Sequence, residues 1–186
     1  MCGRLNIIDD PLTRLVSQIA GIRFTTKSNS NLCPTDSVSV LATAQGRITQ
    51  RTLSWGIKPH WAQRLIINAQ AETAAIKPTF KQAIHQNRVI IPCSGWYEWT
   101  GEKNHKEKYL FRVDDSHPTL MAGIALGEHL VTLTTQANER YRQYHHRMPL
   151  LVQEEDVFDW LGSADSKWVD LLKSSPASHL LVTRCA

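Results

Sequence analysis

The first regular pattern of hydrophobic positions lies near the N-terminus, between residues 10 and 20. Its apolar side chains recur at helical spacing and are Leu12, Leu15, Val16 and Ile19. Asp10 can cap such a helix and Pro11 suits its first turn. Gly21 can end it, because glycine adopts the left-handed conformation without strain. The pattern therefore predicts a short amphipathic helix over residues 10–20.

The next segments have the composition of a hairpin followed by a helix. Residues 37–43 and 47–55 predict two strands that flank Gln45-Gly46, a dipeptide suited to a tight turn. Residues 77–86 predict a helix with Pro78 in its first turn.

A series of strands follows, interrupted by turn-forming glycine and proline. These strands are predicted over residues 88–92, 96–100, 108–113, 119–125 and 129–134. Helices are predicted over residues 136–144, 153–161 and 166–173, and a last strand over 179–184.

Many strands in succession, with helices before and after them, indicate an α+β domain and not a parallel doubly wound sheet. A length of 186 residues fits one domain of ordinary size with a substantial core. We found no internal repeat, low-complexity tract or linker. The expected fold is a single domain over residues 1–186, with a mostly antiparallel, barrel-like β core flanked by short helices.

Composition narrows the setting in which the protein works. No apolar run approaches the ~20 residues of a membrane span, and the N-terminus lacks the pattern of a secretory signal. The four cysteines, Cys2, Cys33, Cys93 and Cys185, are scattered without a CxxC pair. This argues against a disulfide framework and a zinc site, and it favours a reducing cytosol. We therefore expect a cytoplasmic protein with no metal, no cofactor and no membrane partner.

The net charge of +4, with an isoelectric point near 9.0, leans weakly toward anionic partners such as nucleic acid. Trp55 and Trp61 bracket a loop that contains Lys58 and a proline. Such a loop can stack on unpaired bases, although core packing explains one of the two tryptophans equally well.

The N-terminus itself carries candidate chemistry, since Cys2 follows Met1 and precedes Gly3. Removal of Met1 would leave Cys2 with an α-amine and a thiol on adjacent carbons. The amine has a reference pKa of about 7.7–8.0, so roughly a tenth of it is neutral and nucleophilic at pH 7. It can condense with an aldehyde, and the thiol can close the imine into a thiazolidine. A cysteine at position 2 can also occur by chance.

Three further segments place polar residues where a plain strand or helix would not, namely residues 68–73, 92–99 and 145–149. Asn68 could cap a turn, and on its own this is the simpler interpretation.

Two of these segments contain groups that can transfer protons. Glu98 lies among aromatic residues, where burial would raise its pKa and suit it to acid–base catalysis. It could equally face solvent from the outer side of a strand. His145 and His146 could be a surface pair near a helix end, and adjacent histidines alone do not indicate a metal.

Taken together, these segments resemble the SRAP family, the SOS response-associated peptidase-like proteins, which are abasic-site processing proteins. The markers occur in the family's order along almost the whole chain. They are Met-Cys-Gly-Arg at 1–4, Asn-Leu-Cys-Pro-Thr at 31–35, Trp55-Gly56 with Trp61, residues 68–73, 95–99, 133–135 with 137–138, and 145–149. Each marker is weak alone, but the ordered set is specific.

The resemblance implies a reaction. Such proteins bind single-stranded DNA that contains an abasic site and become covalently attached to it. By analogy, the amine of Cys2 would attack the aldehyde of the opened deoxyribose, and its thiol would close a thiazolidine. Glu98 would shuttle protons, Asn68 would orient the amine and the sugar, and His145 would stabilise the sugar oxygen and assist proton transfer.

The resemblance also implies a set of DNA contacts. In this chain they fall on Arg4, Pro34, Trp61, Gln70, Thr134 and Arg147. Arg4 and Arg147 would hold flanking phosphates, for which a forked cation is suited. Pro34 and Trp61 would pack against bases or wedge at the lesion. The implied partner is abasic single-stranded DNA, bound by a monomer that is associated with the nucleoid while on DNA.

One DNA contact departs from the family pattern. The family usually has an arginine where this chain has Gln70, and that arginine resembles a phosphate contact. The change would weaken DNA binding or shift the contact to Lys58, Arg64 or Arg147.

Three other functions compete with this one. Class II glutamine amidotransferases also begin Met-Cys-Gly, but we found no glutamine-binding segments here. A peptidase that removes only its own leader would have little to cleave, because only Met1 precedes Cys2. A non-catalytic reader of single-stranded or modified DNA would bind in a salt-dependent way without a covalent product.

Overall fold

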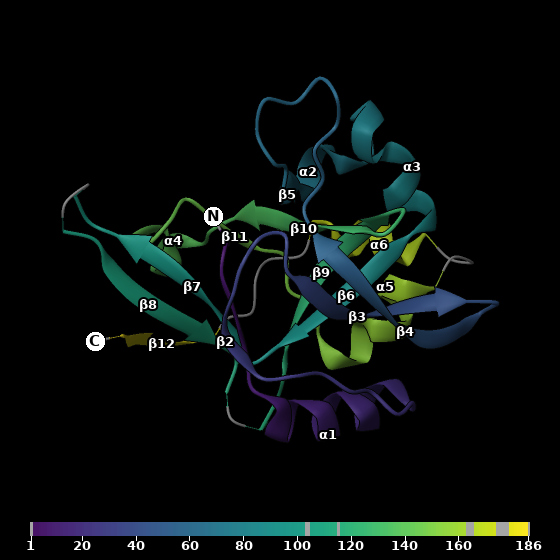
Figure 1. The fold of residues 1–186 in the computed structure, drawn as a ribbon, viewed down its shortest axis with the longest axis horizontal. Coiled ribbons are helices and arrows are strands. Elements are labelled where there is room, and N and C mark those ends of the chain that lie inside the picture. Colours follow the sequence, from purple (N-terminus) through teal and green to yellow (C-terminus); the bar gives the residue numbers. More distant parts are fainter. Residues whose placement is uncertain (1, 103–104, 115, 163–165, 174–178, 186) are drawn as a thin grey trace.

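The computed structural model describes residues 2–102, 105–114, 116–162, 166–173 and 179–185. Within these ranges, short helices surround two β-sheets (Figure 1). The elements in chain order are β1 (Leu5–Ile7), α1 (Asp9–Ala20), β2 (Asn29–Leu32), β3 (Ser37–Ala44), β4 (Arg47–Trp55), β5 (Asn68–Gln70), α2 (Ala71–Ala74), α3 (Pro78–Gln86), β6 (Arg88–Cys93), β7 (Gly95–Thr100), β8 (Glu107–Arg112), β9 (Thr119–Leu126), β10 (His129–Gln136), α4 (Glu139–Arg142), β11 (Arg147–Pro149), the 3-10 helix η1 (Glu154–Asp156), α5 (Val157–Leu161), α6 (Lys167–Leu171) and β12 (Leu181–Arg184).

The larger sheet closes on itself. Its strand order is β11-β10-β4-β3-β6-β9, and β10 also pairs with β9, so that β10, β4, β3, β6 and β9 form a ring. β10 runs parallel to β4 and β5, whereas the other pairings in the described chain are antiparallel. The expectation of an α+β fold with a mostly antiparallel, barrel-like core is confirmed.

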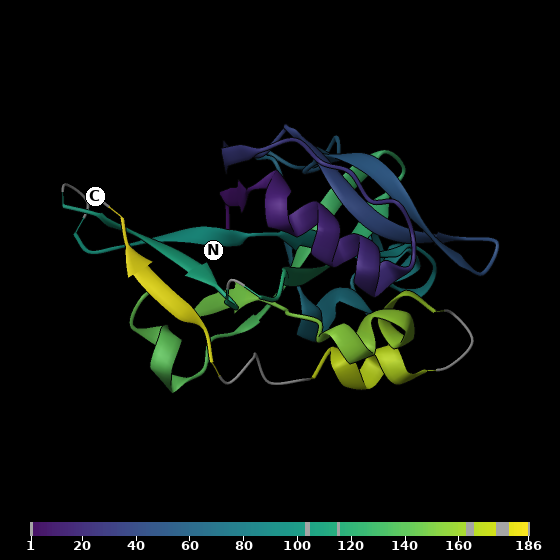
Figure 2. The ribbon, with the colours of Figure 1, turned by 90° about the horizontal axis from the view of Figure 1, so that it is seen from below.

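The smaller sheet has the order β12-β8-β7-β1-β2 and extends to one side of the ring (Figure 2). β1 pairs with β7, with Leu5 opposite Trp96, and the Tyr97 N–H donates to the Arg4 carbonyl oxygen over 3.0 Å. A Cβ atom at Gly95 would collide with the carbonyl oxygen of Phe111, so only glycine allows this approach to β8. The N-terminal segment is thus hydrogen-bonded to the strand that carries Glu98.

Helix α1 confirms the first hydrophobic pattern but corrects its start. Gly21 ends the helix in the left-handed conformation with φ 65°. The helix is assigned from Asp9, one residue earlier than expected, with Ile8 before it; Asp10 has extended dihedral angles (φ −102°, ψ 125°), which are those of an N-cap residue, so the regular turns begin after Asp10.

The predicted helix over residues 136–144 is much shorter in the structure. β10 continues to Gln136, where it pairs with Arg147, and only Glu139–Arg142 are helical. The Asn138 side chain caps this turn by accepting from the Tyr141 N–H over 3.2 Å. Pairing with β11 therefore extends the strand into the segment where local composition favours helix.

A buried arginine joins helices α3 and α5. Arg88 is 4% exposed at the start of β6. Its guanidinium donates to the carbonyl oxygens of Ile84 and Trp160 over 2.8 and 2.6 Å, and also to those of His85 and Gly162. Arg88 thereby holds the C-terminal ends of α3 and α5 together.

None of the described helices is long and apolar enough to cross a bilayer.

Candidate active site at the N-terminal cysteine

Cys2 lies wholly buried where the two sheets meet, although its own position in sequence suggests an exposed terminus. The Asn68 side-chain amide donates to the Cys2 carbonyl oxygen over 2.9 Å. Asn68 is the first residue of β5, opposite Thr132 of β10, so the ring positions it. The structure thus brings two predicted catalytic residues into contact across 66 positions of sequence. Met1 lies outside the described residues.

Glu98 is also buried, with 4% of its surface exposed. The alternative that it faces solvent is therefore wrong. Burial raises the pKa of the Glu98 carboxyl above its usual value. Burial also raises the pKa of the Cys2 thiol well above its usual value, and the charge of the nearby Glu98 adds to this effect. The Cys2 thiol is consequently protonated at neutral pH and needs a base to act as a nucleophile.

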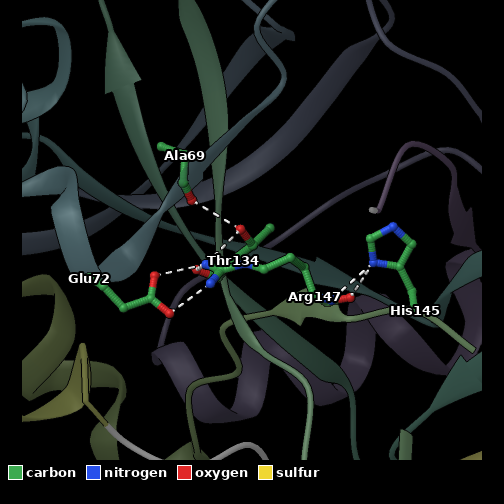
Figure 3. Close-up of polar contacts among 5 residues, drawn as sticks. All are labelled: Ala69, Glu72, Thr134, His145 and Arg147. Carbon is green, nitrogen blue, oxygen red and sulfur yellow. Dashed lines mark hydrogen bonds and ion pairs between the residues drawn. The ribbon is translucent and has the colours of Figure 1, made fainter. Parts of the chain in front are cut away.

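His145 lies just before β11, and the N-terminal segment runs beside its ring (Figures 1 and 3). Its Nδ1 lies 2.9 Å from the Arg147 amide nitrogen and 3.1 Å from the Arg147 carbonyl oxygen. The ring stacks on His146, with the centroids 4.3 Å apart. Partial burial is the main cause that lowers the pKa of His145; the charges of the N-terminal amine, His146 and Arg147 lower it further, whereas the hydrogen bond to the main chain of Arg147 opposes them. The imidazole is therefore neutral at pH 7.

Arg147, predicted to hold a phosphate, is held inside the protein by an acidic partner. Its two terminal nitrogens donate to the two carboxylate oxygens of Glu72, each over 2.8 Å (Figure 3). One of them also donates to the carbonyl and hydroxyl oxygens of Thr134. The Arg147 side chain is only 9% exposed. Partial burial alone would raise the pKa of Glu72, but its hydrogen bonds with Arg147 hold that pKa below the usual value.

An open groove lies beside Asn68 and holds several of the predicted DNA contacts. It has a volume of about 330 Å³, and its lining includes Trp61, Gln70 and Thr134. Trp61 is 59% exposed, whereas Trp55 is wholly buried in the core, so only Trp61 of this pair can stack on a base. Thr134 is 1% exposed, and its hydroxyl donates to the Ala69 carbonyl oxygen over 3.3 Å.

The lysine of this groove was not anticipated from the sequence. Lys77 lines the groove together with Gln70, whereas Lys58 and Arg64 are not among its lining residues in the described chain. Lys77 stands just before α3, and Pro78 opens that helix. The sequence shows Lys77 at the start of a predicted helix. Only the fold brings Lys77 to the same groove as Gln70.

Arg4 and Pro34, the remaining predicted DNA contacts, are not among the described residues that line this groove. Arg4 is half-buried; one terminal nitrogen contacts the Cys33 sulfur, and the guanidinium lies 6.0 Å from the centre of the Trp99 ring. Pro34, next to Cys33, is half-buried. Arg4 is thus placed near both the cysteine segment and the loop of Pro34.

No group of three or more His, Cys, Asp and Glu in the described ranges could hold a metal ion.

Comparison with known proteins places this arrangement in a family. The family model described as SOS response associated peptidase (SRAP) matches residues 1–185. The chain belongs to this family.

Relatives with assigned names align with most of this chain. The abasic site processing protein YoqW of Bacillus subtilis is 28% identical over 182 residues, which cover 87% of this chain and 80% of that protein. The abasic site processing protein YedK of Escherichia coli is 28% identical over 140 residues, covering 70% of this chain and 63% of that protein.

The crystal structure of a phage-related protein from Bordetella bronchiseptica has the same fold. It superposes with a TM-score of 0.83 at 23% identity, covering 99% of this chain and 94% of that one. This likeness supports the fold alone.

Proposed function

We propose that the protein processes abasic sites in DNA by binding single-stranded DNA and forming a covalent thiazolidine through Cys2 after removal of Met1. The observation that carries this proposal is the buried contact between Asn68 and Cys2, with the carboxyl of Glu98 beside them. The relatives named as abasic site processing proteins support the substrate. In this function the chain acts as a monomeric single domain over residues 1–186.

The pKa directions suit the reaction. The Cys2 amine attacks the aldehyde carbon of the opened sugar, and loss of water from the adduct gives an imine that keeps one proton on its nitrogen. Glu98, with its raised pKa, can donate the proton that the departing water needs. The Cys2 thiol, whose pKa is also raised, gives up its proton as sulfur bonds to the imine carbon, and Glu98 can accept that proton. One amine, one aldehyde and one thiol thus yield a thiazolidine and one water.

His145 and Asn68 have complementary tasks in this reaction. A neutral imidazole can donate a hydrogen bond to the sugar oxygen without adding charge to the site. Asn68 holds the main chain of Cys2, so that the amine and the thiol keep one orientation.

DNA would enter along the groove that contains Trp61. Stacking on Trp61, contacts from Arg4 and Pro34, and a polar contact from Gln70 remain the predicted DNA interface. Thr134 would contact DNA only by giving up its bond with Ala69 or Arg147. Arg147 would reach a phosphate only by competing with Glu72 for its guanidinium.

Denaturing electrophoresis tests the function directly, after the protein is mixed with single-stranded DNA that carries one abasic site. Wild type should give a conjugate that resists heat and detergent. Cys2→Ser should lose this product but still form an imine that borohydride traps, whereas Cys185→Ser, which removes a remote thiol, should react normally. An undiminished stable conjugate from Cys2→Ala would rule the mechanism out.

A glutaminase assay and a binding measurement beside the gel separate the competing functions. A class II amidotransferase would instead convert glutamine to glutamate, with loss of that activity in Cys2→Ala. A non-catalytic DNA reader would bind the same oligonucleotide in a salt-dependent way and leave no conjugate on the gel.

A further inference from the structure

We propose that Glu72 is a positioning residue of the active site: its two-pronged ion pair with Arg147 fixes the tautomer and orientation of His145. This inference rests on the proposed function for the task of His145. Its first test does not involve DNA.

The chain of contacts begins at the short helix α2. Glu72 lies in that helix, directly after β5, which carries Asn68. Both carboxylate oxygens of Glu72 are 2.8 Å from the terminal nitrogens of Arg147 (Figure 3). A forked pair of this kind defines both the distance and the plane of the guanidinium, which a single contact does not. The position of Arg147 is therefore determined from outside its own strand.

The next contact passes from the side chain of Arg147 to its main chain. The same guanidinium donates to the carbonyl and hydroxyl oxygens of Thr134, one strand away in β10. Thr134 in turn donates to Ala69 of β5 over 3.3 Å. With its side chain held at both β10 and α2, Arg147 has its amide group in one place at the start of β11.

The tautomer of His145 depends on the position of that amide group. A neutral imidazole has one nitrogen that accepts and one that donates. The amide N–H of Arg147 points at Nδ1 over 2.9 Å, so Nδ1 is the acceptor and the proton is on Nε2. The carbonyl oxygen of Arg147, 3.1 Å from the same nitrogen, would suit only an imidazole protonated at Nδ1. A small shift of Arg147 would thus exchange one partner for the other and reverse the tautomer.

The consequence concerns the reaction. With the proton on Nε2, His145 presents a donor from the side of its ring that faces away from Arg147. In the other tautomer that side would carry a lone pair and could no longer donate to a sugar oxygen. A positioning error of about 1 Å can cost an enzyme about 100-fold in rate.

The experiment is nitrogen NMR of the histidine side chains at pH 7.5, in protein without DNA. The chain has eight histidines, and a His145→Asn variant identifies the signals of interest. In wild type, His145 should show a pyrrole-type Nε2 and a pyridine-type Nδ1. In Glu72→Gln we expect a mixture of tautomers. Glu128→Gln is the matched control, because it breaks the exposed Arg51–Glu128 ion pair and should leave the spectrum unchanged.

A second variant attacks the same contact from its other end. Arg147→Lys keeps the charge and the main-chain N–H but cannot form the fork with Glu72. It should change the tautomer of His145 as Glu72→Gln does. The rate of conjugate formation at saturating DNA should fall by about 10- to 100-fold in either variant. In the double variant the losses should not add, because both changes break one contact.

The possible results are distinct. A wild-type His145 that is protonated at Nδ1 overturns the proposal, and so does an unchanged tautomer in both folded variants. If one variant fails to fold, as circular dichroism would show, the other decides. If wild type forms no conjugate with abasic DNA at all, the proposed function fails while the NMR result still stands or falls separately.

Discussion

Two buried arginines in this protein are stabilised in opposite ways, and the difference separates structure from chemistry. Arg88 is surrounded by carbonyl oxygens at the ends of α3 and α5, and the ring of Trp168 lies 4.7 Å from its guanidinium carbon. No carboxylate in the described residues pairs with it in a salt bridge. Arg147 is instead paired with the carboxylate of Glu72.

The residues around each arginine suggest a different role for it. Burial lowers the pKa of Arg88 to about 10, which still leaves it fully charged at neutral pH, and it serves as a cap for two helix ends. Arg147 lies in a region where the pKa of Glu98 is raised and that of His145 is lowered. Titratable groups pushed toward neutrality from both sides are typical of acid–base sites. The shifted pKa values near Arg147 therefore support the proposed active site, whereas the burial of a charge alone, as at Arg88, does not.

The largest effect that would test this comparison is expected at Glu98. Glu98→Gln keeps the shape of the side chain but removes the exchangeable proton, so conjugate formation should slow by about 10²–10⁴-fold. Affinity for intact single-stranded DNA should stay within a few-fold. A time course at saturating DNA measures the rate, with Glu128→Gln as the control. A normal rate would make Glu98 structural, and a joint loss of affinity would move the proton-transfer role to His145.

The next effect concerns the structural arginine. Arg88→Met should lower the free energy of unfolding by about 3 kcal/mol, since several buried carbonyl oxygens lose their donor. For a chain of this size the midpoint of thermal unfolding should fall by about 6–12 °C. The conjugation rate of the folded variant should match wild type. Arg51→Met, which removes the exposed pair with Glu128 and a hydrogen bond to the Gly127 carbonyl oxygen, should change stability by less than about 0.5 kcal/mol.

A moderate effect is expected at the exposed tryptophan of the groove. Trp61→Ala should weaken binding of single-stranded DNA by about 1–3 kcal/mol, the usual value of one stacked base. Stability should hardly change, because the side chain is 59% exposed. Fluorescence anisotropy with labelled DNA measures the affinity. Phe158→Ala removes a similarly exposed aromatic ring from α5 and should have no effect on binding.

A smaller effect should distinguish the cation of the groove. Lys77→Ala should reduce the slope of log affinity against log salt by about 0.7, the value for one phosphate contact on a single strand. Gln70→Arg should increase the slope by a similar amount. Lys167→Ala, at the surface pair with Asp159, should leave it unchanged. Equal slopes in all four proteins would remove Lys77 and Gln70 from the DNA interface.

The smallest effect is a pH-dependent change in stability at Glu98. A raised pKa means that the folded state binds the proton more tightly, so the protonated carboxyl stabilises the fold at low pH. This contribution is present below the ordinary carboxyl pKa and is lost as pH rises through the folded-state pKa. Glu98→Gln should therefore unfold like wild type at pH 4 and be more stable at pH 8. Chemical denaturation at the two pH values checks this, and a difference of the opposite sign would contradict the raised pKa.

Sequence reasoning predicted most of the longer elements and failed on the shortest ones. The hairpin at Gln45-Gly46 and the strands β6 to β9 lie close to their expected positions, because each carries several residues of a regular pattern. β1, β5 and β11 have three residues each and were not predicted as strands. Three residues show no period, so such a strand exists only through its partner.

The candidate site divides in the same way. The ordered motifs in the sequence point to Cys2, Asn68, Glu98 and His145. The sequence could not decide whether Glu98 faces inward, because alternate positions of a strand look alike without knowledge of its neighbours. Glu72 and Lys77 were missed as functional residues. Each lies near a motif that was recognised, but its partner is distant in the sequence.

By itself, then, the sequence determined the place of Cys2 directly after Met1, the end of α1 at Gly21 and the approximate extents of the long strands, since these depend on covalent structure and local conformation. The tertiary structure decided the closing of the ring through β10 and the burial of Cys2 beside Asn68. It also decided that Arg147 turns toward Glu72. These features depend on which distant segments exclude water from one another, and no local pattern along the chain records that choice.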